Sequence, residues 1–180
     1  LKDYEVILLH DGPRDRKWPP IDSSIKVSLQ KDMAKRYNDW GHSLRDYGIK
    51  QAKGEYIIHF NPDNILYSYA LEELVTTLED PVYKGARMRC VVMPIKMRGV
   101  FCNGKGLLRF PERTDRFFVL NGYPPIYGTI DAMQLVMKRT TWLKEGGWYD
   151  KREKGDGYMY SKFIQKYGAR YCSKICGEHW

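Results

Sequence analysis

The sequence has no pair of cysteines separated by two residues, the spacing that most often holds a structural zinc ion. Its four cysteines, Cys90, Cys102, Cys172 and Cys176, do not form a recognisable disulfide framework. We therefore expect free, buried thiols, which are the usual state in a reducing compartment. An Asn-x-Ser/Thr glycosylation acceptor is also missing, and together these absences predict a cytoplasmic location.

Long apolar runs, internal repeats and low-complexity segments are missing as well. No run approaches the roughly 20 apolar residues that a membrane-spanning helix needs, and the sequence leaves peripheral membrane association open. The hydrophobic fraction of 43% and the charged fraction of 29% are ordinary for a globular protein. A chain of 180 residues is long enough for one domain with a substantial core.

The formal net charge is +8, and a positive field concentrates anionic partners such as nucleotides, nucleic acid or acidic lipid. The basic residues are spread along the chain. The densest stretch, residues 84–98, mixes them with Val91, Val92 and Met93, which is typical of a strand with charged flanks. We therefore read most of the bases as a solvated surface and expect no nucleic acid partner.

The first eighty residues alternate between strand and helix patterns. The expected elements are a strand over 4–9, a short strand near 25–29, a helix over 42–53 ended by Gly54, a strand over 55–60 and a helix over 69–78. This order predicts an α/β fold with a right-handed crossover and a parallel sheet. Ligands of such sheets bind beyond the carboxyl ends of the strands, where Asp11 and the turn at 61–64 are expected.

The second half of the sequence is less regular. We expect strands over 89–96, 117–120, 130–138 and 170–177, a hairpin over 100–110, a short helix over 140–145 and a helix over 157–167 closed by Gly168. The segment Asn103-Gly104-Lys105-Gly106 lacks the full spacing of a phosphate-binding loop and a following helix, so we reject that reading.

The turn Asn61-Pro62-Asp63-Asn64 combines a carboxylate with amide side chains at the end of a predicted buried strand. Mg²⁺ and Mn²⁺ prefer oxygen ligands, usually one or two carboxylates together with substrate phosphates. Taken alone, the motif is also typical of an Asx turn whose side chains cap their own backbone. Both readings stay open at this point.

A series of short motifs in fixed order resembles the nucleotide-binding half of family 2 glycosyltransferases, which have the GT-A fold. The matching segments cover residues 4–78 and are Tyr4–Gly12, Asn38-x-x-Gly41, Arg45, Gly48-Ile49, Ala52-x-Gly54-Glu55-Tyr56-Ile57 and Asn61-x-Asp63. The family's own pattern runs Asp-Asp-Gly-Ser, Asn-x-Gly, Ala-Arg-Asn-x-Gly-Ile, Ala-x-Gly-Glu-Tyr-Ile and Asp-x-Asp. Each piece is weak alone, and the specificity comes from the ordered spacing.

The resemblance implies a role for each matching residue. Asp11 corresponds to the acidic residue that contacts the nucleobase or ribose of the donor. Arg45 corresponds to the basic residue that helps to hold the nucleotide, and Asp63 to the metal-binding second aspartate. Asn61 replaces the first aspartate of the metal motif, and His10 replaces the first acid after the opening strand. The family's first strand and helix would precede Leu1, so we expect the chain to be truncated at its N-terminus.

The later part of the sequence resembles the acceptor-binding half of the same family. Gly146-Gly147 and the aspartate that opens the last helix correspond to a Gly-Gly-Phe/Trp stretch followed by a Glu-Asp motif. Asp156 is thereby the candidate catalytic base, although Gly155 stands where the glutamate would be. An equally good reading of Asp156 is a helix N-cap, and Asp131 and Glu153 are the reserve candidates.

The four histidines differ in context. His10 and His59 lie on or beside buried strands and are expected to be structural, and His42 opens a helix. His179 follows the last strand, and by the resemblance it completes the metal site with Asp63. Imidazole suits Mn²⁺ better than Mg²⁺.

These observations predict a single GT-A domain, with residues 1–85 binding the nucleotide and 86–180 binding the acceptor. The predicted reaction is transfer of a sugar from a nucleoside-diphosphate donor to a glycan or other hydroxyl acceptor, with Mn²⁺ or Mg²⁺ and with inversion. Trp142, Trp148 and Tyr127 either stack on the acceptor or fill the core. A nucleotidyltransferase and a basic nucleic-acid-binding domain are the alternatives.

Overall fold

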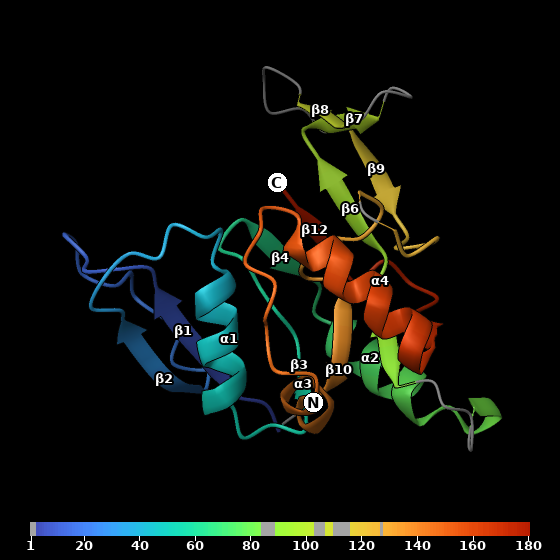
Figure 1. Cartoon of the computed structure of the whole chain (residues 1–180), viewed down its shortest axis with the longest axis horizontal. Helices are drawn as coiled ribbons and strands as arrows, with labels where there is room; N and C mark the ends of the chain where they lie inside the picture. The colour runs from blue at the N-terminus through green and yellow to red at the C-terminus, as the bar shows by residue number, and fades with distance from the viewer. Residues whose placement is uncertain (1–2, 84–88, 103–106, 110–115, 127) are drawn as a thin grey trace. The chain divides into compact units, whose positions relative to one another are not determined.

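The computed structural model describes residues 3–83, 89–102, 107–109, 116–126 and 128–180 (Figure 1). The described chain contains both helices and strands, and the strands form both parallel and antiparallel pairs. The expected α/β fold class is therefore confirmed.

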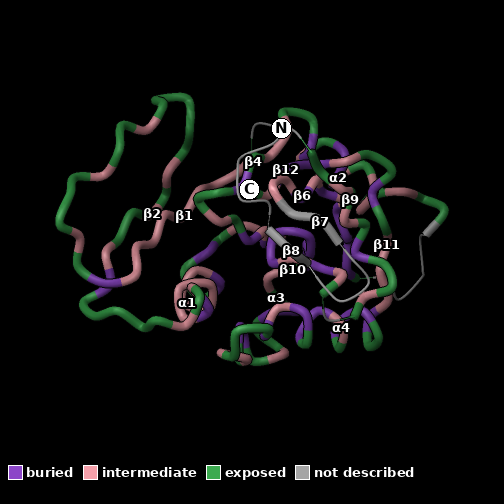
Figure 2. The backbone as a smooth tube through the Cα atoms, turned by 90° about the horizontal axis from the view of Figure 1, so that it is seen from above, coloured by how far each residue is buried: buried purple, intermediate pink, exposed green. Residues whose placement is uncertain are grey.

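Burial varies strongly along the chain (Figure 2). Strands β5 (Cys90–Val92) and β10 (Leu135–Lys138) are buried except at Lys138. The loop over residues 13–26, by contrast, is largely exposed to solvent. A loop of this kind lies at the surface because a buried loop would leave backbone polar groups unsatisfied.

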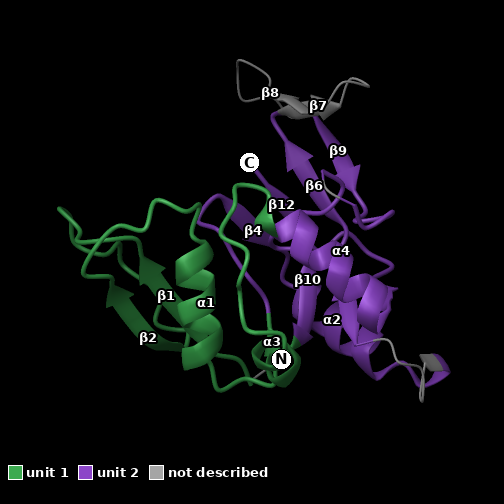
Figure 3. Cartoon of the chain, in the orientation of Figure 1, with its two compact units in different colours: residues 1–57, 138–155 green, residues 58–137, 156–180 purple. Residues whose placement is uncertain are grey.

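The chain divides into two compact units (Figure 3). Unit 1 consists of Leu1–Ile57 and Lys138–Gly155, and unit 2 of Ile58–Met137 and Asp156–Trp180. Each unit is thus built from two stretches of sequence. The expected functional halves, residues 1–85 and 86–180, stay a prediction about ligand binding.

Unit 1 is organised around a parallel strand pair and one helix. Its elements are β1 (Val6–His10), β2 (Val27–Asp32), α1 (His42–Gln51), β3 (Tyr56–Ile57) and α3 (Arg139–Lys144). β1 pairs with β2 in parallel, with Leu8 opposite Gln30, which confirms a strand close to the predicted 25–29. β3 belongs to a different sheet from β1, so these two strands do not form the parallel sheet that the predicted crossover would give.

Helix α1 ends differently from the prediction. The helix stops at Gln51, and Gly54 is not among the glycines with positive φ in the described chain. The carboxylate of Glu5 instead accepts hydrogen bonds from the backbone N–H groups of Lys53 (2.5 Å) and Gly54 (2.7 Å). A side chain 48 residues upstream therefore fixes the chain after the helix, which sequence pattern could not reveal.

Unit 2 contains most of the strands. Its elements are β4 (Asn64–Leu66), α2 (Ala70–Glu79), a 3₁₀ turn η1 (Pro81–Tyr83), β5, β6 (Ile95–Arg98), β7 (Val100–Cys102), β8 (Leu107–Arg109), β9 (Phe117–Leu120), most of β10, most of α4 (Gly155–Tyr167), β11 (Ala169–Tyr171) and β12 (Gly177–His179). β11, β5 and β10 lie side by side in that order, and a second sheet has the order β4-β12-β6-β9. β7 and β8 form an antiparallel hairpin.

Two long predicted strands are each divided in the structure. The strand expected over 89–96 is broken at Met93-Pro94 into β5 and β6, which belong to different sheets. Proline has no N–H to donate to a ladder, so a break there is physically reasonable. The strand expected over 170–177 becomes β11 and β12, again in different sheets, and β4 forms where only a turn was expected.

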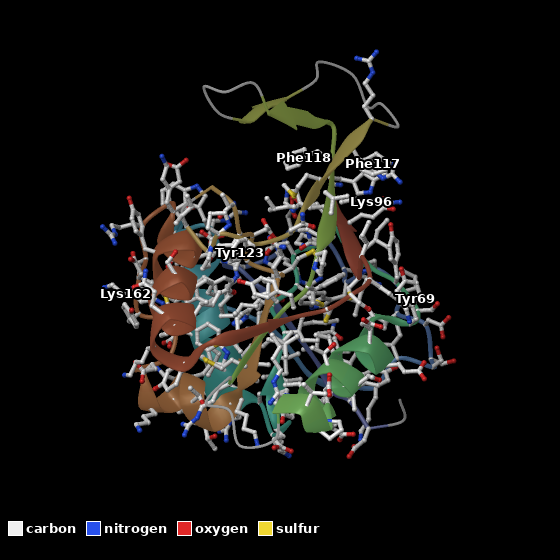
Figure 4. The ribbon with its side chains drawn as sticks, turned by 90° about the vertical axis from the view of Figure 1, so that its right-hand side faces the viewer. Tyr69, Lys96, Phe117, Phe118, Tyr123 and Lys162 are labelled. Atoms are coloured by element: carbon white, nitrogen blue, oxygen red, sulfur yellow. The ribbon has the colours of Figure 1, made fainter. Side chains whose placement is uncertain are left out.

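The sheet β4-β12-β6-β9 has two chemically different faces. Alternation along each strand places Asn64, His179, Met97 and Phe118 in one row, and Ile65, Glu178, Lys96 and Val119 in the row on the opposite face. Figure 4 shows Phe117 and Phe118 on opposite sides of β9. The face with Phe118 also has Ile95 and Met97, which form a buried cluster with Met133.

Three of the four thiols are described, and they are free and buried at Cys90, Cys172 and Cys176, as predicted. The side chain of Cys102 lies outside the described residues. Burial raises the pKa of Cys90 to about 12, so this thiol stays protonated at neutral pH. Among the described residues, we find no helix with the length and apolar character needed to cross a membrane.

Candidate functional site

Asp11 follows β1 in unit 1 and binds the backbone of a loop 26 residues away. Its Oδ1 accepts the N–H of Tyr37 (2.9 Å), and its Oδ2 accepts the N–H of Asn38 (3.2 Å). Gly12 has φ of 93°, and a Cβ there would lie 2.3 Å from Cγ of Arg36, so a glycine is needed next to this contact. Both carboxylate oxygens of Asp11 thus hold residues 37 and 38 in place.

Arg45, on helix α1, is also engaged within unit 1. Its Nη1 donates to the backbone oxygen of Trp40 (2.8 Å) and lies 3.2 Å from Nδ1 of His42. The guanidinium carbon lies 4.9 Å from the ring centroid of Trp148. The arginine therefore fixes the loop before α1 on a buried aromatic ring.

His42, which gave little information in the sequence, is a buried structural residue. Its Nε2 donates to the backbone oxygen of Arg152 (2.7 Å), and its Nδ1 is the acceptor for Arg45. Burial, followed by the neighbouring charge of Arg45, lowers the pKa of His42. The ring is thus held in the neutral form with its proton on Nε2.

The Gly146-Gly147 stretch is attached to α1 by Asp46, a residue that the motif comparison missed. Asp46 Oδ1 accepts the backbone N–H of Trp148 (3.0 Å). Gly147 has φ of 74°, and a Cβ there would lie 2.2 Å from Oδ1 of Asp46. The paired glycines therefore serve a turn that approaches a carboxylate closely.

Trp142 and Trp148 are completely buried, so the core-packing reading is confirmed for both and acceptor stacking by either was wrong. Their rings stack on each other with centroids 5.7 Å apart, and Trp148 stacks on His42 at 5.4 Å. Tyr127 lies outside the described residues.

In unit 2, the turn over 61–64 leads directly into β4. The backbone N–H of Asn61 donates to Oδ1 of Asn64 (2.8 Å), and the N–H of Asn64 donates to the oxygen of Asn61 (3.0 Å). The backbone oxygen of Asp63 accepts the N–H of Trp180 (3.2 Å). The Asp63 side chain is exposed, and within the described residues its carboxylate has no hydrogen-bond or ion-pair partner. The side chain of Asn64 thus caps the backbone of this turn, and the Asp63 carboxylate is left available.

His179 lies beside this turn because β12 pairs with β4 and places His179 opposite Asn64. Nδ1 of His179 accepts a hydrogen bond from Nδ2 of Asn64 (2.8 Å) and lies 3.9 Å from Oδ2 of Asp131. The side chains of Asp131 and His179 are only 17% and 18% exposed. Asp63, Asp131 and His179 therefore belong to one region of unit 2.

Asp131 is fixed by a tight turn of its own. Its Oδ1 accepts the N–H of Met133 (3.0 Å), and its N–H donates to Oε1 of the fully buried Gln134 (2.8 Å). The Gln134 amide nitrogen then donates to the backbone oxygens of Met93 (2.7 Å) and Leu120 (2.8 Å). This satisfied network holds Asp131 next to His179.

Among the described residues, no three His, Cys, Asp or Glu side chains are grouped closely enough to hold a metal by themselves. This does not conflict with a catalytic Mg²⁺ or Mn²⁺, since these ions commonly take one or two carboxylates and complete their shell with substrate phosphates and water. The exposed carboxylate of Asp63 fits that partial donor set. His179 is a less direct ligand. Its Nδ1 accepts a hydrogen bond from Asn64, which places the proton of the neutral ring on Nε2.

Asp156 is in the first turn of α4, and its Oδ1 accepts the N–H of Gly157 (2.8 Å). An acid in the first turn is favourable, because the N-terminus of a helix carries partial positive charge. Gly155 has a packing reason of its own, since a Cβ there would lie 2.6 Å from the backbone oxygen of Asp150. The glutamate expected from the motif would therefore not fit at this position. The reserve candidate Glu153 is exposed.

A buried ion pair on the opposite face of the β4-β12-β6-β9 sheet escaped the sequence analysis. Glu178 accepts two hydrogen bonds from Arg98, one of them from Nη2 at 3.0 Å, and a third from the hydroxyl of Tyr67. The Arg98 hydrogen bond lowers the pKa of Glu178 to about 2. Burial and the bond to Glu178 raise the pKa of Tyr67 to about 12. No local motif signals this cluster, because its members are far apart in sequence.

The remaining histidines agree with their structural assignment. His59 is buried, and His10 is half-buried, with its Nδ1 2.9 Å from the backbone oxygen of Gly12. Both lie in or beside the strand ends that position the candidate residues, and neither is grouped with two other potential metal ligands in the described chain.

Comparison with known proteins identifies a family over most of the chain. The sequence model of glycosyl transferase family 2 matches residues 1–135. A cholesterol galactosyltransferase from Borreliella burgdorferi (strain ATCC 35210 / DSM 4680 / CIP 102532 / B31) is 31% identical over 118 residues, which cover 62% of this chain and 30% of the relative.

A similar fold is found in the crystal structure of S. aureus TarS 1-349. The TM-score is 0.56 at 13% sequence identity, and the match covers 86% of this chain and 44% of the TarS chain. At this identity the likeness concerns the fold alone. The chain spans less than half the length of each of these two relatives.

Proposed function

Because the chain belongs to glycosyl transferase family 2, we propose that it moves a sugar from a nucleoside-diphosphate donor to a hydroxyl group of an acceptor. The family match favours this reaction over the nucleotidyltransferase and nucleic-acid-binding alternatives. The observation that carries the proposal is the exposed carboxylate of Asp63, close in the fold of unit 2 to the half-buried pair of His179 and Asp131.

Asp11 and Arg45 are the proposed nucleotide residues of unit 1. Their hydrogen bonds go to the backbone of residues 37, 38 and 40, so both hold the loop before α1 in one conformation. We assign them to the nucleotide site through this loop, whose shape they fix. The proposed metal residues Asp63 and His179, with Asn61 beside them, belong to unit 2.

The chemistry is a displacement at the anomeric carbon of the donor sugar. The acceptor oxygen forms the new bond, the bond to the diphosphate breaks, and the electron pair leaves with the diphosphate. Asp156 accepts the proton of the acceptor hydroxyl, a task that suits an ionised carboxylate. Attack opposite the leaving group gives inversion. A Mg²⁺ or Mn²⁺ ion, when bound at Asp63, supplies charge stabilisation for the leaving diphosphate.

Peripheral membrane association is supported by one face of unit 2. Ile65, Phe117 and Val119 are exposed on the β4-β12-β6-β9 sheet. Nζ of Lys96 lies 4.7 Å from the ring centroid of Phe117 (Figure 4). Apolar and basic side chains together suit an anionic lipid surface. Sedimentation with anionic vesicles, but not with neutral ones, and loss of binding in Phe117→Ser, would support this association.

The donor is tested by a thermal-shift screen of UDP-, GDP- and CDP-sugars with and without Mn²⁺. Binding that involves the folded state raises the melting temperature in proportion to the logarithm of ligand concentration over Kd. We expect one nucleotide class to stabilise the chain, more strongly with Mn²⁺. A chain that no nucleotide sugar stabilises, and that binds oligonucleotides with a steep salt dependence, would support the nucleic-acid alternative instead.

A further inference from the structure

Trp40 is an unusual residue in unit 1 because its large apolar side chain is 61% exposed. Its backbone is also unusual, with φ of 55°, in the left-handed region that bulky residues rarely adopt. Conformations of this kind persist only where the surroundings enforce them, and they are concentrated at binding and catalytic sites.

The surroundings enforce this conformation from both sides. Asp11 holds the N–H groups of Tyr37 and Asn38, and Asn38 itself has φ of 54°. Arg45 holds the backbone oxygen of Trp40 (2.8 Å). After the turn, Oδ2 of Asp39 accepts the N–H (3.0 Å) and the hydroxyl (2.5 Å) of Ser43 and so fixes the start of α1. The loop is thus a built support for the indole ring.

The indole ring is the outer end of an aromatic column. The ring centroids of Trp40 and His42 are 6.4 Å apart, those of His42 and Trp148 are 5.4 Å apart, and those of Trp148 and Trp142 are 5.7 Å apart. The inner three rings are buried, and His42 is neutral because its pKa is lowered. The indole of Trp40 is therefore an uncharged aromatic ring that is exposed to solvent and supported by three buried rings.

Left-handed backbone is concentrated in the loop before α1. Within four residues the chain takes three positive φ angles, at Asn38, Trp40 and Gly41. Of these three residues, Trp40 alone has a large apolar side chain.

We propose that Trp40 forms a stacking platform for the base of the donor nucleotide. A flat, uncharged aromatic face suits a nucleobase, because every base has a π-face and stacking tolerates the identity of the base. Two side chains that hold the loop, Asp11 and Arg45, are the residues assigned above to the nucleotide. The inference rests on the proposed function and adds a residue that contacts the base directly.

The test is calorimetric titration of the whole chain with UDP and with GDP in the presence of Mn²⁺. Trp40→Ala is expected to weaken binding of the preferred nucleotide by roughly 5- to 100-fold, the usual loss when one aromatic stacking partner is removed. Trp40→Tyr keeps an aromatic ring and is expected to bind within a few-fold of the wild type. Trp40→Leu, which is apolar without a ring, is expected to bind as weakly as Trp40→Ala.

Three controls separate stacking from a structural role. Binding of inorganic pyrophosphate with Mn²⁺ is expected to be unchanged in Trp40→Ala, since pyrophosphate has no base to stack. Tyr171→Ala removes an exposed aromatic side chain from β11 and is expected to leave nucleotide binding unchanged. Trp40→Gly relieves the left-handed backbone, so it is expected to melt no lower than the wild type and still to bind nucleotide weakly.

Wild-type affinity of Trp40→Ala for the nucleotide, in a chain that binds it well, overturns the Trp40 assignment and leaves the proposed function standing. An equal loss of pyrophosphate binding overturns it too, because the effect is then not on the base. Unchanged nucleotide binding with a raised KM for the acceptor would show that the ring stacks on acceptor. Absence of nucleotide binding by the wild-type chain removes the proposed function and this inference together.

Discussion

Two regions of the molecule carry the candidate residues, and their side chains are held in opposite ways. In unit 1, the side chains of Asp11 and Arg45 make hydrogen bonds to neighbouring backbone groups, and the Arg45 guanidinium also packs on the ring of Trp148. In unit 2, the Asp63 carboxylate is exposed and has no partner among the described residues. The difference teaches that matching motif residues can have different tasks. An acidic or basic side chain whose hydrogen bonds are all made within the protein shapes the site. A carboxylate without such partners is available to bind a ligand.

The sharpest test of this contrast is Asp63→Ala. We expect Mn²⁺-dependent sugar transfer to fall by more than about 1,000-fold, because a bound cation contributes several kcal/mol to stabilising the leaving diphosphate. The melting temperature should stay within error, because the removed carboxylate has no partner in the described chain. Transfer rates and thermal melts of the same preparation measure both. Retained turnover would refute the metal assignment.

Asp156→Asn tests the proposed base in unit 2. Transfer is expected to fall by roughly 100-fold or more, the usual contribution of a positioned base, while donor binding by calorimetry stays intact. The reserve candidates are tested in parallel by Asp131→Asn and Glu153→Gln. Normal transfer by Asp156→Asn, with a loss in one of the other two variants, moves the base to that residue.

Glu178→Gln tests the buried ion pair on the far face of the unit 2 sheet. Leaving Arg98 without its anionic partner is expected to cost about 3 kcal/mol of unfolding free energy at neutral pH. The folded-state pKa of Glu178, about 2, is below its unfolded value. The wild type is therefore more stable than Glu178→Gln by the full amount above about pH 5, and this extra stability is lost as the pH falls towards 2.

Urea denaturation of both proteins from pH 7 to pH 3 measures this difference. If the difference in unfolding free energy between the wild type and Glu178→Gln becomes smaller as the pH falls, the ion pair is confirmed. A gap that does not change over this range would contradict a lowered pKa at Glu178.

Asp11→Ala gives the smallest expected effect and completes the comparison. Loss of two hydrogen bonds from a carboxylate to backbone N–H groups is expected to lower the free energy of unfolding by about 1–2 kcal/mol. The urea midpoint should fall while the slope stays constant, which indicates a change in stability alone. Asp11→Ala with wild-type stability would mean that the contacts to residues 37 and 38 contribute nothing, and the contrast with Asp63 would fail.

The sequence predicted those elements whose signals are local. Gly168 has φ of 67° and closes α4, as its position suggested. Gly146 and Gly147 likewise follow α3 with positive φ. At these turns the glycines decide the backbone, whereas after α1 the distant Glu5 does, and the pattern failed there.

Predictions based on continuous apolar runs were less accurate. Residues 89–96 and 170–177 each look like one strand, yet each contributes to two sheets. Which sheet a short strand joins depends on partners far away in sequence, such as β12 between β4 and β6. β4 itself was missed because Asn64 reads as a turn residue.

The candidate site shows the same division. The motif order pointed to Asp11, Arg45, Asp63, Asp156 and His179, and their roles as ligands or catalysts stay predictions. The structure added Asp46, Glu178 and Trp40, whose importance depends on contacts with distant residues. It also decided between the two readings of Trp142 and Trp148, which are both in the core.

The amino-acid order alone determined the fold class, the glycine-dependent turns and the family to which the chain belongs, because periodicity, φ preferences and motif spacing are carried by neighbouring residues. Only the tertiary structure decided which acidic side chains have hydrogen-bond partners and which are available to a ligand. Such partners are far apart in sequence: Asp11 and residue 37 are separated by 26 positions, and His179 and Asn64 by 115. A side chain's chemistry is fixed by its type, but its availability is fixed by what folding brings beside it.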